Sequence, residues 1–489
     1  MKKIEQLISE NSFTRLPQIF FSRVYPTPLI NPYLVSFNQD VADLIELSSQ
    51  EATRKEFSHC FIGNKLLPDS DPLAMVYAGH QFGHFVSQLG DGRAILLGEA
   101  KTSTGTNWHI QLKGAGPTPY SRNGDGRAVL RSSIREYLCS EAMHGLGIPT
   151  TRALCIVGSD EEVYRESIET AAVVTRIATS FVRFGSFELF YHRGEYEQIG
   201  QLADYVIAQD FPYLLDSNEK YEKFFQEILV RTAHLMAQWQ AVGFSHGVMN
   251  TDNMSIIGLT FDYGPFGFME SYQPGYICNH SDHDGRYAFD QQPQIGLWNL
   301  SALAQALRPL ISVEQAEEIL DTYSEIFSVH YVKLMCQKMG MEYRGLEDFS
   351  IIEPFLSLMR DNHLDFTNTF RSLSNFKIDK DEKNSSLRDR CVDRVAFDSW
   401  AGIYRNRLLD QDNDDSERKL RMDRVNPKYI LRNYLAQTAI KMAEEARDYS
   451  EIDRLLTLLL KPFDEQPEME SYAAPAPEWA QHIEVSCSS

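Results

Sequence analysis

The stretch from residue 245 to residue 268, SHGVMNTDNMSIIGLTFDYGPFGF, constrains the fold more than any other part of this 489-residue chain. It predicts a tight loop that ends at residues 252–253 (Asp-Asn), a short pair of strands, and then residues 262–264 (Asp-Tyr-Gly). Carboxylate and carboxamide oxygens are the ligands that a hard cation such as Mg²⁺ prefers. The segment therefore predicts a divalent-metal site on two neighbouring loops, completed by the oxygens of a bound phosphate.

An asparagine followed closely by Asp-aromatic-Gly is the pattern with which protein-kinase-like folds hold Mg²⁺ on a nucleoside triphosphate. A kinase carries its catalytic aspartate five residues before that asparagine, and Val248 stands there in this chain. The metal ligands are thus present without the usual base. This leaves open a kinase-like fold that has lost catalysis and one that does different chemistry on ATP. Asp252–Asn253 alone would fit an Asx turn equally well.

A lysine and a glutamate fit the same interpretation. Lys113 ends a predicted strand at residues 107–113 whose side chains alternate in character, and Glu136 lies 23 residues later on a helix predicted over residues 128–144. In kinases such a glutamate orients the lysine, which neutralises phosphate charge. A lysine and a glutamate at this spacing can also be unrelated surface residues. The prediction of a functional pair therefore depends on the lysine ending a strand and the glutamate lying on the following helix.

Glycines and arginines supply further candidate phosphate contacts. Gly90 and Gly92 in QLGDGR would let backbone N–H groups approach a phosphate, and Arg93 would add a positive charge, although a plain turn explains the same residues. Arg176 and Arg183 flank the expected connection between two lobes, and each could bind a phosphate through two hydrogen bonds.

The order of the predicted elements indicates an α+β class: a two-lobed, protein-kinase-like fold with a β-rich N-lobe over residues 1–185 and a larger helical C-lobe with extra helices over residues 186–489. Residues 220–242 form the clearest amphipathic helix, and helical periodicity returns at 296–340 and 428–461. The charged stretches 377–390 and 409–424 are expected on the surface. Strands are predicted at residues 94–100, 107–113, 152–157 and 171–177.

Composition limits the classes of partner. A formal net charge of −21 argues against general nucleic-acid binding, and no apolar run is long enough to cross a membrane. The N-terminal residues lack a signal-peptide core, so we expect a cytoplasmic protein. The seven cysteines include no C-x-x-C pair, which argues against a zinc ribbon, and most should be buried thiols. Cys278, in the polar stretch CNHSDHD, and Cys487, near the C-terminus, are the expected exceptions.

Several long motifs are similar to those of one known family, namely YAGHQFG (77–83), QLGDGRA (88–94), QLKGAGPTPYSRNGDGRAVLRSSIREYL (111–138), SHGVMNTDNMS (245–255) and TFDYGPFGFM (260–269). Through them the chain resembles the SelO family, called YdiU in bacteria. Its members are pseudokinases that act as protein adenylyltransferases. The resemblance extends over essentially the whole chain.

The resemblance implies transfer of AMP from ATP to Ser, Thr or Tyr hydroxyls of proteins with release of pyrophosphate, and ATP bound in reversed orientation. We expect a monomer. It implies Asp252 as the general base, Mg²⁺ or Mn²⁺ held by Asn253 and Asp262, and Glu136 paired with Lys113. The residues that it places on the nucleotide are Gly90, Gly92, Arg93, Lys113, Asp125, Gly126, Arg176, Arg183 and Asp262.

Two alternatives remain at this point, a kinase-like phosphotransferase and an ATP-binding scaffold without catalysis. Only the identity of the transferred phosphate separates the first from an adenylyltransferase. Some family members carry selenocysteine near the C-terminus, where this chain has Cys487. We hypothesise from this that Cys487 and Cys278 form a reversible, regulatory disulfide.

Overall fold

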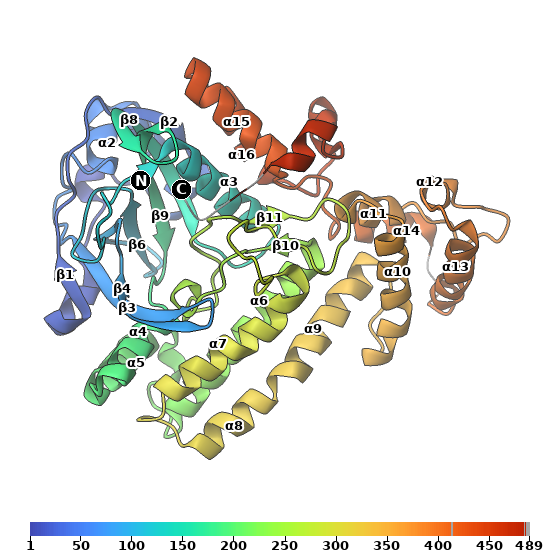
Figure 1. Ribbon diagram of the computed structural model, residues 1–489, viewed down its shortest axis with the longest axis horizontal. Helices are drawn as coiled ribbons and strands as arrows, with labels where there is room; N and C mark the ends of the chain where they lie inside the picture. Colours follow the sequence, from blue (N-terminus) through green and yellow to red (C-terminus); the bar gives the residue numbers. More distant parts are fainter. Residues whose placement is uncertain (412–413, 484, 486–489) are drawn as a thin grey trace.

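A computed structural model describes residues 1–411, 414–483 and 485 of the chain. Its N-terminal part contains a nine-stranded, antiparallel sheet in the order β1-β3-β5-β6-β9-β8-β2, with β4 paired to β3 and β7 paired to β9 (Figure 1). The strands are β1 Phe21–Arg23, β2 Tyr33–Phe37, β3 Leu73–Gln81, β4 His84–Gly90, β5 Ala94–Lys101, β6 Asn107–Lys113, β7 Ala128–Val129, β8 Arg152–Tyr164 and β9 Ile168–Ala178.

The central strand β6 shows how the sequence pattern positions functional side chains. Ile110 and Leu112 are fully buried in an apolar cluster with α1 (Gln39–Leu44) and α2 (Lys55–Phe61). Because side chains alternate along a strand, Gln111 and Lys113 project from the other face. The predicted alternation is confirmed, and it directs polar groups to the face of the sheet opposite α1 and α2.

The helix predicted over residues 128–144 is confirmed as α3 (Leu130–Gly145), which lies between β7 and β8 in the chain, although residues 128–129 form β7 instead of its first turn. The remaining helices make up the C-terminal part, so the expected two-lobed α+β architecture is confirmed. They are α4 Phe184–Arg193, α5 Tyr196–Asp210, α6 Lys220–Val242, α7 Gln292–Ala306, α8 Val313–Asp321, α9 Tyr323–Lys338, α10 Phe349–Asp361, α11 Phe366–Leu373, α12 Ser385–Arg388, α13 Arg394–Leu409, α14 Asp415–Asp423, α15 Asn433–Ala446 and α16 Ser450–Leu459.

Helix α6 is the central helix of this part. It has no internal Gly or Pro, and it ends at Gly243, which adopts the left-handed conformation that favours glycine. Phe224 and Phe225 pack in a cluster with α4 and α5, whereas Met236 and Trp239 pack in a second cluster with α3 and α15. Full burial of each such side chain stabilises the fold by roughly 1.5–3 kcal/mol.

The end of the chain returns to the N-terminal part of the molecule. Helices α15 and α16 lie over α3 (Figure 1) and share an apolar core with it. Ser36 of β2 donates a 2.7 Å hydrogen bond to Asp453 of α16. The C-terminal helices therefore support the helix that carries Glu136, a long-range contact that periodicity cannot reveal.

Two local predictions are wrong. The stretch 409–424 is not purely surface, because Arg418 and Met422 of α14 are fully buried and Arg418 pairs with Asp415 at 2.7 Å. The short strand pair does not lie between residues 253 and 262. It is formed by β10 (Phe244–Ser245) and β11 (Gly267–Phe268), which bracket the whole segment. None of the helices in the described part of the chain combines the length and apolar character needed to cross a membrane.

Candidate active site

A cavity of about 570 Å³ lies between the polar face of the sheet and the loops that follow α6. The structure brings all of the predicted nucleotide, metal and base residues to the wall of this one cavity. Those that line it are Gly90, Gly92, Arg93, Lys113, Asp125, Gly126, Glu136, Arg176, Arg183, Asp252, Asn253 and Asp262.

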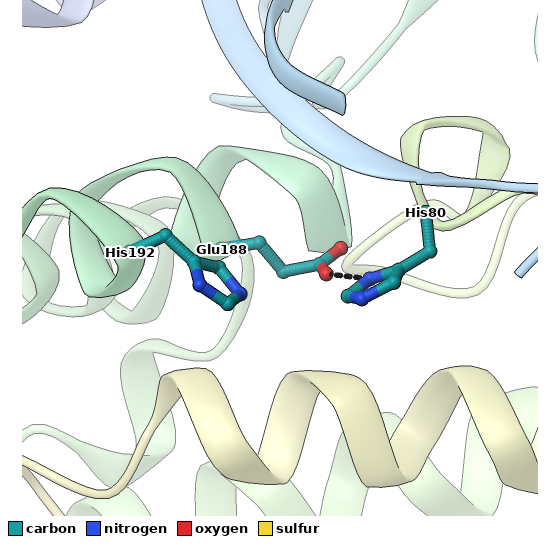
Figure 2. A group of neighbouring side chains, drawn as sticks. All are labelled: His80, Glu188 and His192. Atoms are coloured by element: carbon teal, nitrogen blue, oxygen red, sulfur yellow. Dashed lines mark hydrogen bonds and ion pairs between the residues drawn. The ribbon is translucent and has the colours of Figure 1, made fainter. Parts of the chain in front are cut away.

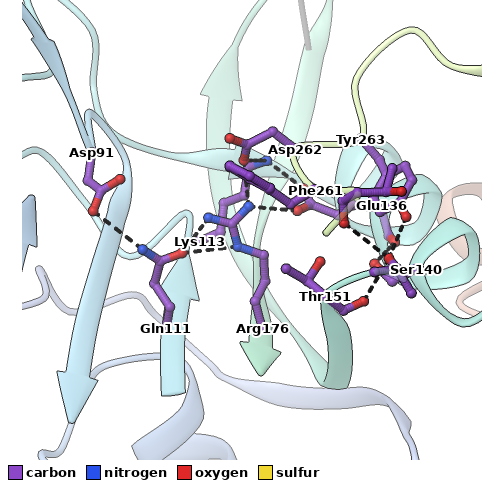
Figure 3. A network of polar contacts seen from close by, with 12 residues as sticks. Asp91, Gln111, Lys113, Glu136, Ser140, Thr151, Arg176, Phe261, Asp262 and Tyr263 are labelled. Atoms are coloured by element: carbon purple, nitrogen blue, oxygen red, sulfur yellow. Dashed lines mark hydrogen bonds and ion pairs between the residues drawn. The ribbon is translucent and has the colours of Figure 1, made fainter. Parts of the chain in front are cut away.

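Lys113 is held between two carboxylates. Its Nζ lies 2.6 Å from Oε2 of Glu136 on α3 and 3.2 Å from Oδ1 of Asp262 (Figure 3). The predicted lysine–glutamate pair is therefore formed. Because Lys113 is the last residue of β6, the strand fixes its Cα while Glu136 fixes the direction of its side chain.

Two arginines converge on the same aspartate. Arg176, on β9 opposite Gln111, donates to Oδ1 of Asp262 and lies 3.0 Å from Oε1 of Glu136. Arg183, at the N-terminus of α4, donates to Oδ2 of Asp262 and, over 2.7 Å, to the carbonyl oxygen of Asp252. Asp262 thus faces three cations, which are the charges that would meet the phosphates of a bound nucleotide.

These contacts determine the charge state of the cluster. Burial alone would raise the pKa of Asp262, but the charges of Arg183, Lys113 and Arg176 outweigh it and hold that pKa well below its usual range. Burial lowers the pKa of Lys113, against the opposing effect of Glu136 and Asp262. Asp262 is therefore ionised at neutral pH, as a metal ligand must be.

Asp252 occupies a separate, protected position beside this cluster. It lies in a 3₁₀ turn (Thr251–Asn253), and its Oδ2 accepts a 3.2 Å hydrogen bond from Nε2 of Gln81. Burial raises its pKa to about 6. Its Oδ1 is buried without a hydrogen-bond partner in the described part of the chain. A carboxylate with a raised pKa and a free oxygen can accept a proton near neutral pH.

The residues present fit a hard divalent cation. Nδ2 of Asn253 donates to the carbonyl oxygen of Val248 at 3.2 Å, which turns the amide oxygen away from that contact. This oxygen, the Asp262 carboxylate and the unpartnered Oδ1 of Asp252 are all oxygen donors on the cavity wall. Oxygen donors of this kind suit Mg²⁺ or Mn²⁺.

The sequence GDGRA occurs twice, at residues 90–94 and 124–128, and both segments lie at the cavity. A Cβ added at Gly90, whose φ is +151°, would lie 2.4 Å from the ring of Tyr120, so this glycine is required for close packing of the two loops. A Cβ at Gly126 would lie 2.2 Å from the backbone of Gly116. Ser121 of the second loop donates to the carbonyl oxygen of Gly92. The glycines therefore have a packing role in the loops that line the cavity.

Asp125 is held by a neighbouring arginine. Arg165 donates two hydrogen bonds to its carboxylate, at 2.8 and 3.0 Å. The pKa of Asp125 is lowered by this arginine. Arg93 also lines the cavity, and burial lowers its pKa.

Sequence reasoning did not assign a role to several polar residues that complete the site. Tyr77 lies under the guanidinium of Arg183, with its ring centroid 4.6 Å away. Asp91 lies 3.7 Å from the same arginine, and Gln111 accepts a 3.1 Å hydrogen bond from Nε of Arg176 (Figure 3). The sequence could have indicated that Tyr77 and Gln81 lie together, because residues four positions apart on one strand share a face of the sheet.

Cys278 is not exposed, contrary to the expectation from its polar surroundings. It is buried, it donates weakly to Ser245, and burial raises its pKa to about 12. The other described cysteines are also buried and free, as expected. Cys487 lies outside the described residues. Within the described part of the tail, the carbonyl oxygen of Val485 accepts a 2.9 Å hydrogen bond from the backbone of His280.

Comparison with known proteins identifies the family of this chain. The family model described as protein adenylyltransferase SelO matches residues 3–460. The chain is 56% identical over 489 residues to the protein nucleotidyltransferase YdiU of Thiobacillus denitrificans, and 52% identical over 489 residues to that of Myxococcus xanthus. It is 54% identical over 495 residues to that of Thioalkalivibrio sulfidiphilus, and in all three cases 100% of both chains is covered. The chain therefore belongs to the SelO family of protein adenylyltransferases.

Proposed function

We propose that this chain transfers AMP from ATP to Ser, Thr or Tyr hydroxyls of protein substrates, with release of pyrophosphate. Nucleotidyl transfer follows from the family to which the chain belongs. One observation carries the finer proposal. Asp252, with a free carboxylate oxygen, stands beside a cluster of three cations, whereas Val248 occupies the position of the kinase base.

In the proposed reaction the acceptor hydroxyl loses its proton to the Asp252 carboxylate. The hydroxyl oxygen forms a bond to the α-phosphorus, and the bond between that phosphorus and the oxygen bridging to the β-phosphate breaks. The departing pyrophosphate keeps the electron pair. Its negative charge is stabilised by Arg176, Arg183 and Lys113, which are already oriented by Glu136 and Asp262.

A Mg²⁺ or Mn²⁺ ion held by Asn253 and Asp262 would neutralise phosphate charge and orient the triphosphate. On nucleotide binding, Lys113, Arg176 and Arg183 would exchange their present partner, the Asp262 carboxylate, for phosphate oxygens. The positive charges that Asp262 neutralises in this structure would turn to phosphate oxygens, and Asp262 would turn to the metal. We propose that the protein acts in this way in the cytoplasm and as a monomer.

We further propose redox control through Cys278 and Cys487. The hydrogen bond between Val485 and His280 supports this proposal. Val485 precedes Cys487 by two residues, and His280 follows Cys278 by two residues, so the bond holds Val485 beside the loop that contains Cys278. The disulfide would form by loss of two electrons and two protons to a cellular disulfide oxidant. Cys487→Ser should abolish any activity difference between reduced and oxidised protein. An unchanged difference in that variant would overturn the proposal.

The proposed chemistry can be tested through its products. Purified protein is incubated with ATP, Mg²⁺ or Mn²⁺ and an acceptor protein under reducing conditions, and the modified peptides and released nucleotide products are identified by mass spectrometry. We expect AMP on hydroxyl side chains and one pyrophosphate per modification. Phosphate on the acceptor together with ADP would contradict the proposal and identify a kinase.

A further inference from the structure

A second cluster of potential metal ligands lies outside the cavity. It consists of His80 near the end of β3 and of Glu188 and His192 on α4 (Figure 2). Glu188 and His192 are four positions apart and therefore lie on one face of the helix. One potential ligand atom from each of the three residues lies within 4.8 Å of the others.

Glu188 lacks a full set of partners. Its side chain is 1% exposed, and its Oε2 lies 2.5 Å from Nδ1 of His80. Its Oε1 is buried with no hydrogen-bond partner, and no lysine or arginine of the described residues forms an ion pair with it. A buried carboxylate with a free oxygen is costly unless it is paired or bound to a metal.

The two histidines suit a soft or borderline cation. His192 is exposed, and its ring lies 3.9 Å from that of Phe85 in a tilted arrangement. His80 contacts the edge of Trp298 at a ring distance of 5.2 Å. Neutral imidazoles are the form that binds metal. The exposure of His192 provides a route by which an ion could enter.

We propose that His80, Glu188 and His192 form a second divalent-metal site, distinct from Asn253 and Asp262, that prefers Zn²⁺ or a similar transition ion. Two imidazoles and one carboxylate favour such ions, whereas Mg²⁺ favours all-oxygen sites. Ligands about 2.0–2.2 Å from a tetrahedral ion lie roughly 3.3 Å apart. The His80–Glu188 contact would therefore open slightly, and the exposed His192 side chain would move inward.

This site would tie α4 to the strand beside the proposed base. The backbone N–H of His80 donates to Oγ1 of Thr251 at 2.7 Å, and the adjacent Gln81 donates to Asp252. A bound ion would thus restrain the end of β3 next to the 3₁₀ turn that carries Asp252. It would act as a positioning element, with no contact to the nucleotide.

The test uses full-length protein that has been stripped of metal with a chelator and then titrated with Co²⁺ in excess Mg²⁺. Visible absorption reports nitrogen ligation of Co²⁺, and metal content reports stoichiometry. We expect one Co²⁺ per chain, displaced by Zn²⁺, in the wild type and in Asp262→Ala. We expect the signal to be lost in His192→Ala and Glu188→Gln, and kept in His144→Ala, which removes an exposed histidine elsewhere.

Absence of stoichiometric Co²⁺ in the wild type would overturn the second site, as would equal binding by His192→Ala. Binding that is lost in Asp262→Ala but kept in His192→Ala would place the ion in the nucleotide cavity and overturn it as well. None of these readouts depends on transferase activity, so failure of this site and failure of the proposed function are distinguishable.

Discussion

At the scale of single residues, the central feature is that two neighbouring carboxylates, Asp262 and Asp252, differ in their pKa. Asp262 is surrounded by three cations and remains ionised, whereas Asp252 is buried among weaker partners and has a pKa of about 6. The first is suited to hold a metal and the second to accept a proton. A kinase holds its metal through an aspartate at the position of Asp262, but its base stands five residues before the asparagine, where this chain has Val248.

Replacing Asp252 by Asn should lower the rate of transfer by about 10²–10⁴-fold while ATP still binds, because only the proton acceptor is lost. In the wild type, kcat/KM should fall about tenfold per pH unit below pH 6, where the carboxylate becomes protonated. Initial rates over pH 5–8 and nucleotide titrations measure both effects. Asp290→Asn, at an exposed carboxylate, is the control. An Asp252→Asn variant with wild-type rates would rule out Asp252 as the general base.

Gly79 should be sensitive to the addition of one methyl group. A Cβ at this position would lie 2.8 Å from Oδ1 of Asp252 and 3.0 Å from its backbone nitrogen. Gly79→Ala should therefore displace the proposed base and lower kcat by about tenfold or more, with about 1–3 kcal/mol lost from the free energy of unfolding. Gly275→Ala should change neither quantity, because a Cβ added there has no atom of the described residues within 4 Å apart from those of its chain neighbours. Equal kinetics of the two variants would refute the close contact.

At the scale of elements, the position of α3 depends on a contact with the end of the chain. Its last residue, Gly145, packs directly on the backbone of α16, since an added Cβ would lie 2.0 Å from the carbonyl oxygen of Leu459. Helix α3 carries Glu136 and hence orients Lys113. The distant helices α15 and α16 thus contribute to the geometry of the cavity.

Gly145→Ala should destabilise the protein by about 1–3 kcal/mol, because neither backbone can easily move. The matched control is Gly402→Ala in α13, where an added Cβ meets no atom within 4 Å among the described residues outside its own helix turn. That substitution should stabilise the protein by about 0.5–1 kcal/mol, since alanine favours helix more than glycine does. Urea unfolding of both variants measures the difference. If both variants gained stability, α16 would not be docked on α3 in solution.

The contact between α6 and α9 should make stability depend on pH. The rings of His234 and His330 stack with centroids 4.1 Å apart, and burial, helped by the neighbouring His234 and Lys333, lowers the pKa of His330 to about 4. The unfolded chain binds this proton near its ordinary pKa of about 6.5. Protonation therefore favours unfolding, and stability should decrease as pH falls from about 6.5 towards 4.

Because His330 is only partly buried, we expect this effect to be about 1–2 kcal/mol. His330→Gln should remove most of the loss of stability between pH 7 and pH 5 in urea unfolding, whereas His84→Gln, at an exposed position, should leave it unchanged. Identical pH dependence in wild type and His330→Gln would show that other groups determine acid stability.

At the scale of the whole molecule, local pattern indicated most of the residues that line the cavity, and the family resemblance added Asp125 and Gly126. Neither indicated the elements that support them. Alternation in β6 and periodicity in α6 follow from one apolar face each, so both elements were predicted with their correct bounds. The burial of Arg418 and the docking of α16 on α3 were not predictable in this way, because each depends on residues far away in the sequence. The free oxygens of Asp252 and Glu188 likewise emerge only from three-dimensional neighbours.

We expect the α-phosphate of ATP to move to protein, because the proposed base faces a cavity whose three cations suit a pyrophosphate leaving group. Parallel reactions with ATP labelled at the α- or γ-phosphate test this most directly, with Asp262→Ala as the control. Label that reaches the acceptor protein only from α-labelled ATP, and is lost in the control, is the predicted result. Transfer of label from γ-labelled ATP would contradict the account.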